Sequence, residues 1–146
     1  MSGRSIIRDM KEEDYDAVMR VWKEADLPRK CSGRDSREAL LSELENGKSR
    51  LLVALIDGKL VGTLLVTHDG RKGWMNRLGV LRGYRGRGIA SDMLDEGEKW
   101  LEECGIAIFA CLIEGHNEGS MTFFEKKGYQ EFKGVKYFTK RLHPDV

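Results

Sequence analysis

A glycine-rich basic loop carries the clearest chemistry in this sequence. Residues 78–90 read LGVLRGYRGRGIA, so three glycines alternate with three arginines between an apolar run and an expected helix. Glycines let backbone amides turn toward one ligand, and the amides at a helix start are unpaired and positive. Residues 70–91 hold six Lys or Arg and no acid, whereas the whole chain has a net charge of +1. The loop therefore predicts a site for a small anion such as phosphate.

Two common phosphate loops do not fit this spacing. A P-loop needs Lys followed by Ser or Thr after its last glycine, whereas Gly88 is followed by Ile89 and Ala90. A dinucleotide loop needs G-x-G-x-x-G in the first strand–helix unit, whereas the order here is G-x-x-G-x-G in the middle of the chain. Sites for a nucleoside triphosphate or a dinucleotide are therefore disfavoured.

Composition narrows the class of protein. A chain of 146 residues fits one domain, expected over residues 1–146, and its near-zero net charge disfavours nucleic acid as a partner. Three cysteines form no Cys-x-x-Cys pair, and no histidine has metal-ligand spacing, so we expect neither disulfides nor a metal, and a reducing cytoplasm. The start has no apolar signal core, and the longest apolar run, Leu51 to Ile56, is too short for a bilayer; we expect no export and no membrane insertion.

Hydrophobic periodicity predicts the elements that position the loop. In the first half we expect a short strand at Ile6 and Ile7, two helices, and two antiparallel strands joined by the Asp57-Gly58 turn. The helices are expected at Lys11 to Ala25 and from Asp35 or Ser36 to Asn46-Gly47, and the paired strands at Leu51 to Ile56 and Leu60 to Thr67.

The second half is expected to contain the strand that leads into the loop. Trp74 to Val80 forms that strand, and a helix runs from about Gly88 to Cys104-Gly105. A strand buried on both faces follows at Ile106 to Ile113, for which a parallel neighbour is one expected arrangement, and then a helix at Asn117 to Lys127. A closing hairpin is expected at Tyr129 to Phe132 and Val135 to Leu142. The order predicts a mixed α+β domain.

Of the basic residues, Arg71, Lys72 and Arg77 are interpreted as solvated surface charges.

Two motifs in order resemble the GNAT superfamily of N-acetyltransferases. Arg85-Gly86-Arg87-Gly88-Ile89-Ala90 matches the family's acyl-CoA loop, which is Gln or Arg, two residues, Gly, one residue, then Gly or Ala. The second motif follows as Asn117-x-x-Ser120-x-x-Phe123-Phe124-x-x-x-Gly128-Tyr129. The resemblance covers essentially the whole chain, and the segments 21–28 and 78–80 are similar to the YpeA-like branch. It implies a GNAT-like fold, with a mostly antiparallel sheet of six or seven strands and about four helices.

The resemblance also implies a cofactor site. Amides of Arg85, Gly86, Arg87, Gly88, Ile89 and Ala90 would hold the CoA pyrophosphate, with the Arg85 side chain beside it. Leu78 and Val80 would pair with the pantetheine arm, Gly79 would allow a bulge, and the amide at Leu78 or Val80 would polarise the thioester carbonyl. The second motif adds Asn117 and Phe124 to the cofactor site. From the residues alone, a helix cap at Asn117 and a core residue at Phe124 are equally good interpretations.

The catalytic residues are less defined. An amine would attack the thioester directly, but Phe124 stands where many relatives have a Tyr general acid, and it has no proton to give. Ser120 is the first candidate donor, with Tyr129 and Cys111 as alternatives, and the thiolate can also leave unassisted. Glu114 is the first candidate base, with Asp69, His68 or an ordered water as alternatives.

These observations favour a cytoplasmic acetyltransferase. Its partners would be acetyl-CoA as donor and a primary amine of a small molecule or protein as acceptor, with no metal and no membrane. One alternative changes the donor to a longer acyl-CoA, and another is a non-catalytic acyl-CoA sensor, which Phe124 supports. A nucleic-acid-binding domain is the least favoured. Family members are often dimers, so a homodimer is a state that the resemblance allows.

Overall fold

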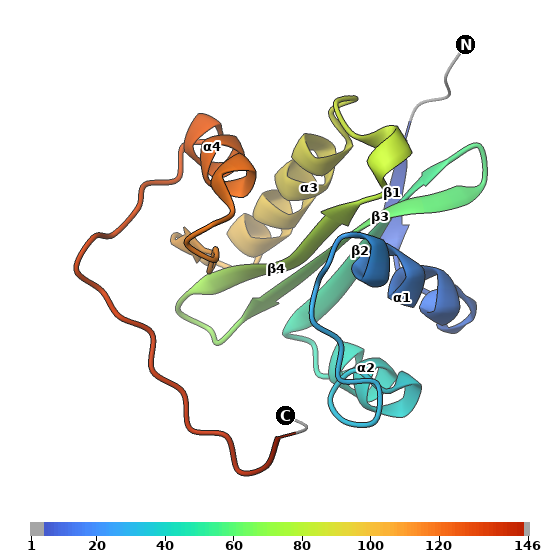
Figure 1. Ribbon diagram of the computed structural model, residues 1–146, viewed down its shortest axis with the longest axis horizontal. Coiled ribbons are helices and arrows are strands. Elements are labelled where there is room, and N and C mark those ends of the chain that lie inside the picture. Colours follow the sequence, from blue (N-terminus) through green and yellow to red (C-terminus); the bar gives the residue numbers. More distant parts are fainter. Residues whose placement is uncertain (1–4, 145–146) are drawn as a thin grey trace.

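The computed structural model describes residues 5–144, and these contain one five-stranded sheet with the strands in chain order (Figure 1). The first four strands pair antiparallel and the fifth pairs parallel with the fourth. The mixed α+β fold expected from the sequence is confirmed. A single domain over residues 1–146 stays a prediction, since residues 1–4 and 145–146 lie outside the described part. The strands are β1 (Ile6–Asp9), β2 (Ser49–Ile56), β3 (Lys59–His68), β4 (Gly73–Val80) and β5 (Phe109–Ala110).

Four α-helices accompany the sheet in the described residues, as expected, together with two short 3-10 turns. The predicted helices all form, within a few residues of their expected ends. Ser36 begins the second helix because its hydroxyl accepts from the amide of Ala39 (3.2 Å). The helical elements are η1 (Glu12–Asp14), α1 (Tyr15–Glu24), α2 (Arg37–Leu44), η2 (Arg82–Tyr84), α3 (Ile89–Glu103) and α4 (Glu118–Lys126).

The helices cover both faces of the sheet. On β3 the Thr63 hydroxyl meets Trp22 of α1, whereas a Cβ at the preceding Gly62 would lie 2.9 Å from Met93 of α3. Successive residues of a strand face opposite sides, so α1 and α3 lie on opposite faces. Lys127, just after α4, donates to Asp95 of α3 (2.7 Å), which places α4 beside α3 (Figure 1). The fully buried core therefore has two layers of side chains around β2 and β3.

β5 is much shorter than expected. The apolar run Ile106 to Ile113 predicted a strand buried on both faces, but only Phe109 and Ala110 pair with β4, and Ile108 is 51% exposed. The parallel direction is confirmed. The length was wrong because an apolar run forms a ladder only where a neighbouring backbone continues beside it. β4 and β5 part beyond Trp74, so that no strand among residues 5–144 pairs with the later half of β4 on that side.

The predicted closing hairpin is also wrong within the described residues. Residues 129–142 form no strand and leave large apolar side chains exposed, among them Phe132 and Phe138 at 85% and 86%. In Figure 1 this segment runs as an open arc from α4 toward the loop before α2. Strand propensity needs a partner edge and a surface to cover, and neither is met here. The sheet consequently has five strands instead of six or seven.

Candidate active site

The glycine loop joins the end of β4 to the start of α3, where the sequence predicted it. Gly86 and Gly88 have φ values of +77° and +82°, and Gly88 is the residue that precedes the first turn of α3. A residue with a Cβ is strained at such φ values, so these two positions favour glycine. The left-handed conformation at Gly88 brings the chain sharply into the helix and leaves the loop backbone uncovered.

The loop amides are available to an external acceptor. Within residues 5–144, no hydrogen bond uses the amides of Gly86, Arg87, Gly88, Ile89 or Ala90, and the loop from Arg85 to Gly88 is exposed. The first amide of the helix that has a partner is Asp92, which donates to Gly88 O (3.0 Å). Free amides at a helix N-terminus together form a site for an oxyanion.

The arginines of the loop hold its shape as well as supplying charge. Arg85 donates from Nε to the carbonyl oxygen of Val80 (2.9 Å), and Arg87 donates to Gly83 O (3.3 Å). The guanidinium carbon of Arg87 also lies 5.0 Å from the centre of the Tyr84 ring, on which it stacks. Arg85, predicted to lie beside a pyrophosphate, therefore first ties the loop to the strand, and the Val80 carbonyl is already occupied.

Leu78 and Val80 lie on the stretch of β4 that has lost β5 as its neighbour. The expected bulge is present nearby, but it is at Arg77 and Leu78, which together stand opposite Leu64, and not at Gly79. Arg77 has a φ of +57°. Gly79 serves packing instead, since a Cβ there would lie 3.2 Å from that of Ala25, just after α1. The attribution of the bulge to Gly79 was therefore wrong.

The contacts of the second motif, on α4, are mainly structural. Asn117 caps the helix, because its side-chain oxygen accepts from the amide of Ser120 (3.1 Å). Phe124 is 5% exposed and packs edge-on against Phe123 and Tyr129 at ring distances of 5.3 and 5.0 Å. Ser120 is half-buried. A cofactor role for Asn117 and Phe124 and a catalytic role for Ser120 stay predictions.

The candidate bases differ in their hydrogen bonds and in their position relative to the glycine loop. Glu114 follows β5 and is exposed, with one carboxylate oxygen 3.6 Å from His116 Nδ1. Asp69 caps a turn through the amides of Arg71 and Lys72, and these hydrogen bonds lower its pKa. His68 ends β3 opposite Gly73, the first residue of β4, and Asp69 follows it, so both lie at the other end of β4 from the glycine loop. Of the two carboxylates, Glu114 is therefore the one whose oxygens are less engaged by hydrogen bonds.

The alternative proton donors are poorly suited to that role. The Tyr129 hydroxyl donates to Glu98 of α3 (2.7 Å), and burial together with this bond raises its pKa above the ordinary range. Burial raises the pKa of the Cys111 thiol to about 11. Such groups give up a proton reluctantly at neutral pH. Within residues 5–144, Tyr129 and Cys111 are therefore unsuited to protonate the leaving thiolate.

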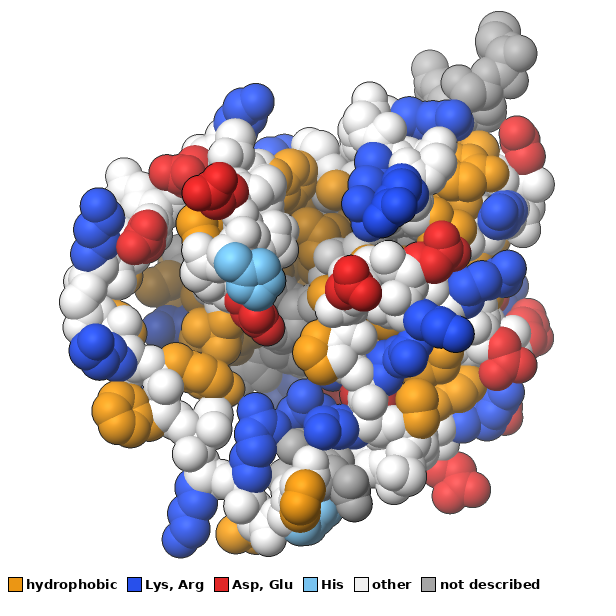
Figure 2. Space-filling view, viewed as in Figure 1, with side chains coloured by type: hydrophobic (Ala, Val, Ile, Leu, Met, Phe, Trp, Pro, Cys, Tyr) orange, Lys and Arg blue, Asp and Glu red, His pale blue; other side chains and the backbone are white. Residues whose placement is uncertain are grey.

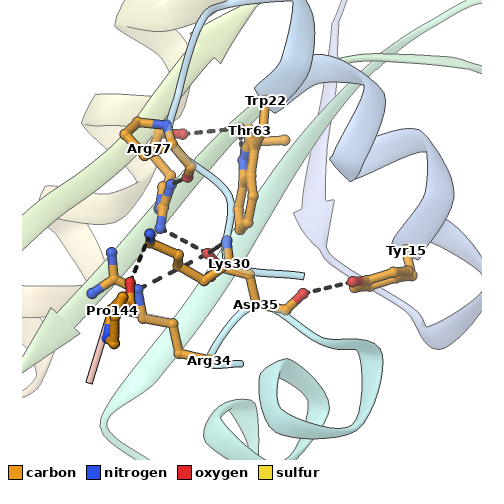
Figure 3. Close-up of polar contacts among 9 residues, drawn as sticks. Tyr15, Trp22, Lys30, Arg34, Asp35, Thr63, Arg77 and Pro144 are labelled. Carbon is orange, nitrogen blue, oxygen red and sulfur yellow. Dashed lines mark hydrogen bonds and ion pairs between the residues drawn. The ribbon is translucent and has the colours of Figure 1, made fainter. Parts of the chain in front are cut away.

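A buried polar cluster beside the bulge was missed by sequence reasoning. Arg77, interpreted as a solvated charge, has a side chain that is 12% exposed and pairs with the buried carboxylate of Asp35 (3.1 Å; Figure 3). The lone basic residue in a strand gave no local sign of this partner, which lies 42 residues away. Only a positive charge within an otherwise mostly apolar strand hinted at it.

The molecular surface has a hollow on the face that contains β4. Figure 2 shows a hollow near the middle of the face on which β4 is seen in Figure 1, with hydrophobic side chains in its walls and Lys or Arg side chains at its lower rim. Within residues 5–144, no cluster of three or more His, Cys, Asp or Glu side chains could hold a metal. No helix in that same part of the chain is long and apolar enough to cross a membrane.

Comparisons with known proteins agree with this geometry. The family described as "Acetyltransferase (GNAT) family" matches residues 7–129. An acetyltransferase of Sodalis glossinidius (strain morsitans) is 31% identical over 139 residues, covering 95% of this chain and 96% of that protein. The aminoglycoside N-acetyltransferase AAC(6')-Iy, solved with a CoA-containing bisubstrate analogue, superposes with a TM-score of 0.79 at 19% identity and covers 95% of this chain and 99% of its own.

A second solved structure has the same fold. The PaiA N-acetyltransferase from Thermoplasma acidophilum, in complex with coenzyme A, gives a TM-score of 0.76 at 22% identity, with 87% of this chain and 90% of that chain covered. At these identities the two structures establish the likeness of fold, while the family match and the Sodalis relative establish the relationship.

Proposed function

Because the chain belongs to the GNAT acetyltransferase family, we propose that it transfers an acetyl group from acetyl-CoA to a primary amine of a small molecule or protein. The observation that carries this proposal is the row of amides from Gly86 to Ala90 at the start of α3, which have no hydrogen-bond partner among the described residues. They would bind the pyrophosphate of CoA. Hydrogen bonds to charged groups contribute roughly 1.5–3 kcal/mol each, so several together would account for much of a micromolar affinity.

The place where β4 and β5 part suits the rest of the coenzyme. Leu78 and Val80 lie on this unpaired stretch of β4, directly before the loop. An extended pantetheine arm would lie along it and bring the thioester to the bulge, where the amide of Leu78 or Val80 would polarise the carbonyl oxygen. The PaiA and AAC(6')-Iy structures contain CoA or a CoA-derived analogue in the same fold, which supports CoA as a ligand of this chain.

Direct attack by the amine is the favoured route. The amine nitrogen forms a bond to the thioester carbon, the carbon–sulfur bond breaks, and the amine proton leaves to a base, for which Glu114 is the first candidate. A covalent route through Cys111 is disfavoured, because a thiol with a pKa of about 11 is almost entirely protonated at neutral pH. The CoA thiolate would take a proton from Ser120 or from water.

The chemistry of the attack favours a primary amine as the acceptor. A primary amine is mostly an ammonium ion at neutral pH and must lose a proton before it attacks, so an exposed carboxylate such as Glu114 would attract the cation and accept its proton. The AAC(6')-Iy complex contains an analogue built on an acetylated amine, which supports an amine acceptor.

A non-catalytic acyl-CoA-binding module is the second candidate. Phe124 favours it, since this residue is buried among aromatic rings and cannot donate a proton. The two candidates share the coenzyme site and differ only in turnover.

Calorimetric titration with acetyl-CoA, repeated in the presence of adenosine diphosphate, tests the shared site. Micromolar binding that the diphosphate weakens is expected; no binding by folded protein would overturn both candidates. Release of CoA thiol during a screen of primary amines then separates them. Turnover with any amine establishes the enzyme, and tight binding with no thiol release across the screen favours the sensor.

A further inference from the structure

The bulge in β4 is held by a buried chain of hydrogen bonds from α1. Trp22 donates from Nε1 to the hydroxyl oxygen of Thr63 (3.0 Å), and that hydroxyl donates to the carbonyl oxygen of Arg77 (2.9 Å; Figure 3). Trp22 and Thr63 are both fully buried. Because each hydroxyl has one proton, the Thr63 proton is directed to Arg77 O as long as its oxygen accepts from the indole.

This chain sets the direction of the next amide. In a trans peptide the C=O and the following N–H point in opposite directions, and no peptide bond in the described residues is cis. Since the Arg77 carbonyl points to Thr63 on β3, the Leu78 N–H points away from β3. That is the side on which β5 has already parted from β4. The amide therefore faces the opening that the coenzyme would enter.

The side chain of Arg77 also holds the peptide bond between Arg77 and Leu78 in place. Its guanidinium donates to the carbonyl of Pro28 and to Asp35, and its carbon lies 4.7 Å from the centre of the Trp22 ring (Figure 3). Asp35 is itself held, because its carboxylate accepts from the amide of Lys30 (2.8 Å). The φ of +57° at Arg77 costs energy for a residue with a Cβ, so these contacts maintain a conformation that the backbone alone would leave.

We propose that Thr63 and Arg77 are positioning residues that aim the Leu78 amide at the thioester carbonyl of bound acetyl-CoA. The inference rests on the proposed function. Thr63 acts through the Arg77 carbonyl, and Arg77 acts by anchoring the strained peptide to the loop that contains Pro28 and Asp35. Neither side chain touches the coenzyme in this arrangement. Both would be needed for polarisation of the carbonyl and not for binding of the phosphates.

The carbonyl stretching band of bound acetyl-CoA, labelled with carbon-13 at the thioester carbon, reports this polarisation. In the wild type a hydrogen bond from Leu78 should move the infrared band to lower wavenumber than in free acetyl-CoA. Thr63→Val keeps the shape and removes the hydroxyl, so the shift should be lost while the dissociation constant for CoA stays unchanged. Thr63→Ser keeps the hydroxyl and should retain the wild-type shift.

Arg77→Lys and Arg34→Gln extend the test to the second residue. Arg34 Nε lies 4.0 Å from the same Asp35 oxygen, but its side chain is 51% exposed and not part of β4. Arg77→Lys should reduce the shift, and Arg34→Gln should leave it unchanged. If Thr63→Val does not fold, Arg77→Lys against Arg34→Gln decides the question.

The outcomes separate this inference from the proposed function. No acetyl-CoA binding by the wild type would overturn the proposed function. Binding by the wild type without a band shift, or an unchanged shift in Thr63→Val or in Arg77→Lys, would overturn the positioning role alone. An equal loss in Arg34→Gln and Arg77→Lys would also overturn it, because the effect would then come from a general disturbance of the contacts around Asp35 and not from the anchoring of the Arg77 peptide.

Discussion

The Nε of Arg85 lies 2.9 Å from the carbonyl oxygen of Val80, so the glycine loop is tied back to the last residue of the strand that leads into it. This bond orients the loop backbone before any ligand arrives. The guanidinium keeps its remaining N–H groups for an anion at the rim. One side chain thus links the shape of the loop to its charge.

Replacing Arg85 by Gln should weaken CoA binding about tenfold or more, because a charged hydrogen bond of roughly 1.5–3 kcal/mol and the tie to Val80 are both lost. Titration calorimetry at fixed salt measures the change. Arg82→Gln is the matched control: Arg82 lies in η2, three residues before Arg85, and its replacement leaves the bond between Arg85 and Val80 in place, so it should have a smaller effect. Equal losses in the two variants would mean that only the net charge of the loop matters.

Replacing Gly88 by Asp should abolish CoA binding while the protein stays folded. The carboxylate would stand among the free amides of the loop and repel a phosphate. Gly105→Asp is the control, since Gly105 has the same φ of +82° and the same open surroundings at the opposite end of α3. Both variants should melt at similar temperatures. Wild-type affinity in folded Gly88→Asp would refute the loop as the phosphate site.

Replacing Phe124 by Tyr tests the missing proton donor. The new hydroxyl would lie among buried rings without a partner, so the free energy of unfolding should fall by about 1–3 kcal/mol with CoA affinity unchanged. Chemical denaturation measures this. Phe123→Tyr, at a half-buried position, is the control and should cost less. A rise in amine acetylation by Phe124→Tyr would instead show that a donor at this position limits turnover.

Replacing Asp14 by Asn should reduce stability near neutral pH by about 1–2 kcal/mol, since Asp14 accepts from Arg8 and from the Lys11 amide. The hydrogen bond from Arg8 lowers the pKa of Asp14 below its ordinary value of 3.8. A lowered pKa stabilises the fold above 3.8, and this stabilisation is lost as pH falls through the folded-state value.

The pH dependence of unfolding checks the sign of that effect. The wild type should lose stability on acidification below about pH 4, and Asp14→Asn should lose less of it over that range. Asp16→Asn is the control, because the Asp16 side chain is 90% exposed and its contact with Arg37 is 3.8 Å. Parallel curves for the wild type and Asp14→Asn would contradict the assignment.

Most of the fold follows from local patterns. The Asp57-Gly58 turn between two apolar runs predicted the β2–β3 hairpin, and the helix stripe after Gly88 predicted α3; both form where expected. The length of β5 and the hairpin after Tyr129 were not predictable in the same way. A strand at a sheet edge depends on backbone partners from elsewhere in the chain, and alternation within one segment carries no information about them.

The phosphate-type loop and its position before a helix follow from the sequence alone. Positive φ at glycine and free amides at a helix start are local properties, so six consecutive residues from Arg85 to Ala90 are enough to specify them. The bulge at Arg77, the direction of the Leu78 amide and the burial of the Arg77–Asp35 pair depend instead on tertiary contacts. Those features join β3, β4, α1 and the loop before α2. Contacts between segments so far apart in sequence form only when the packed core brings them together.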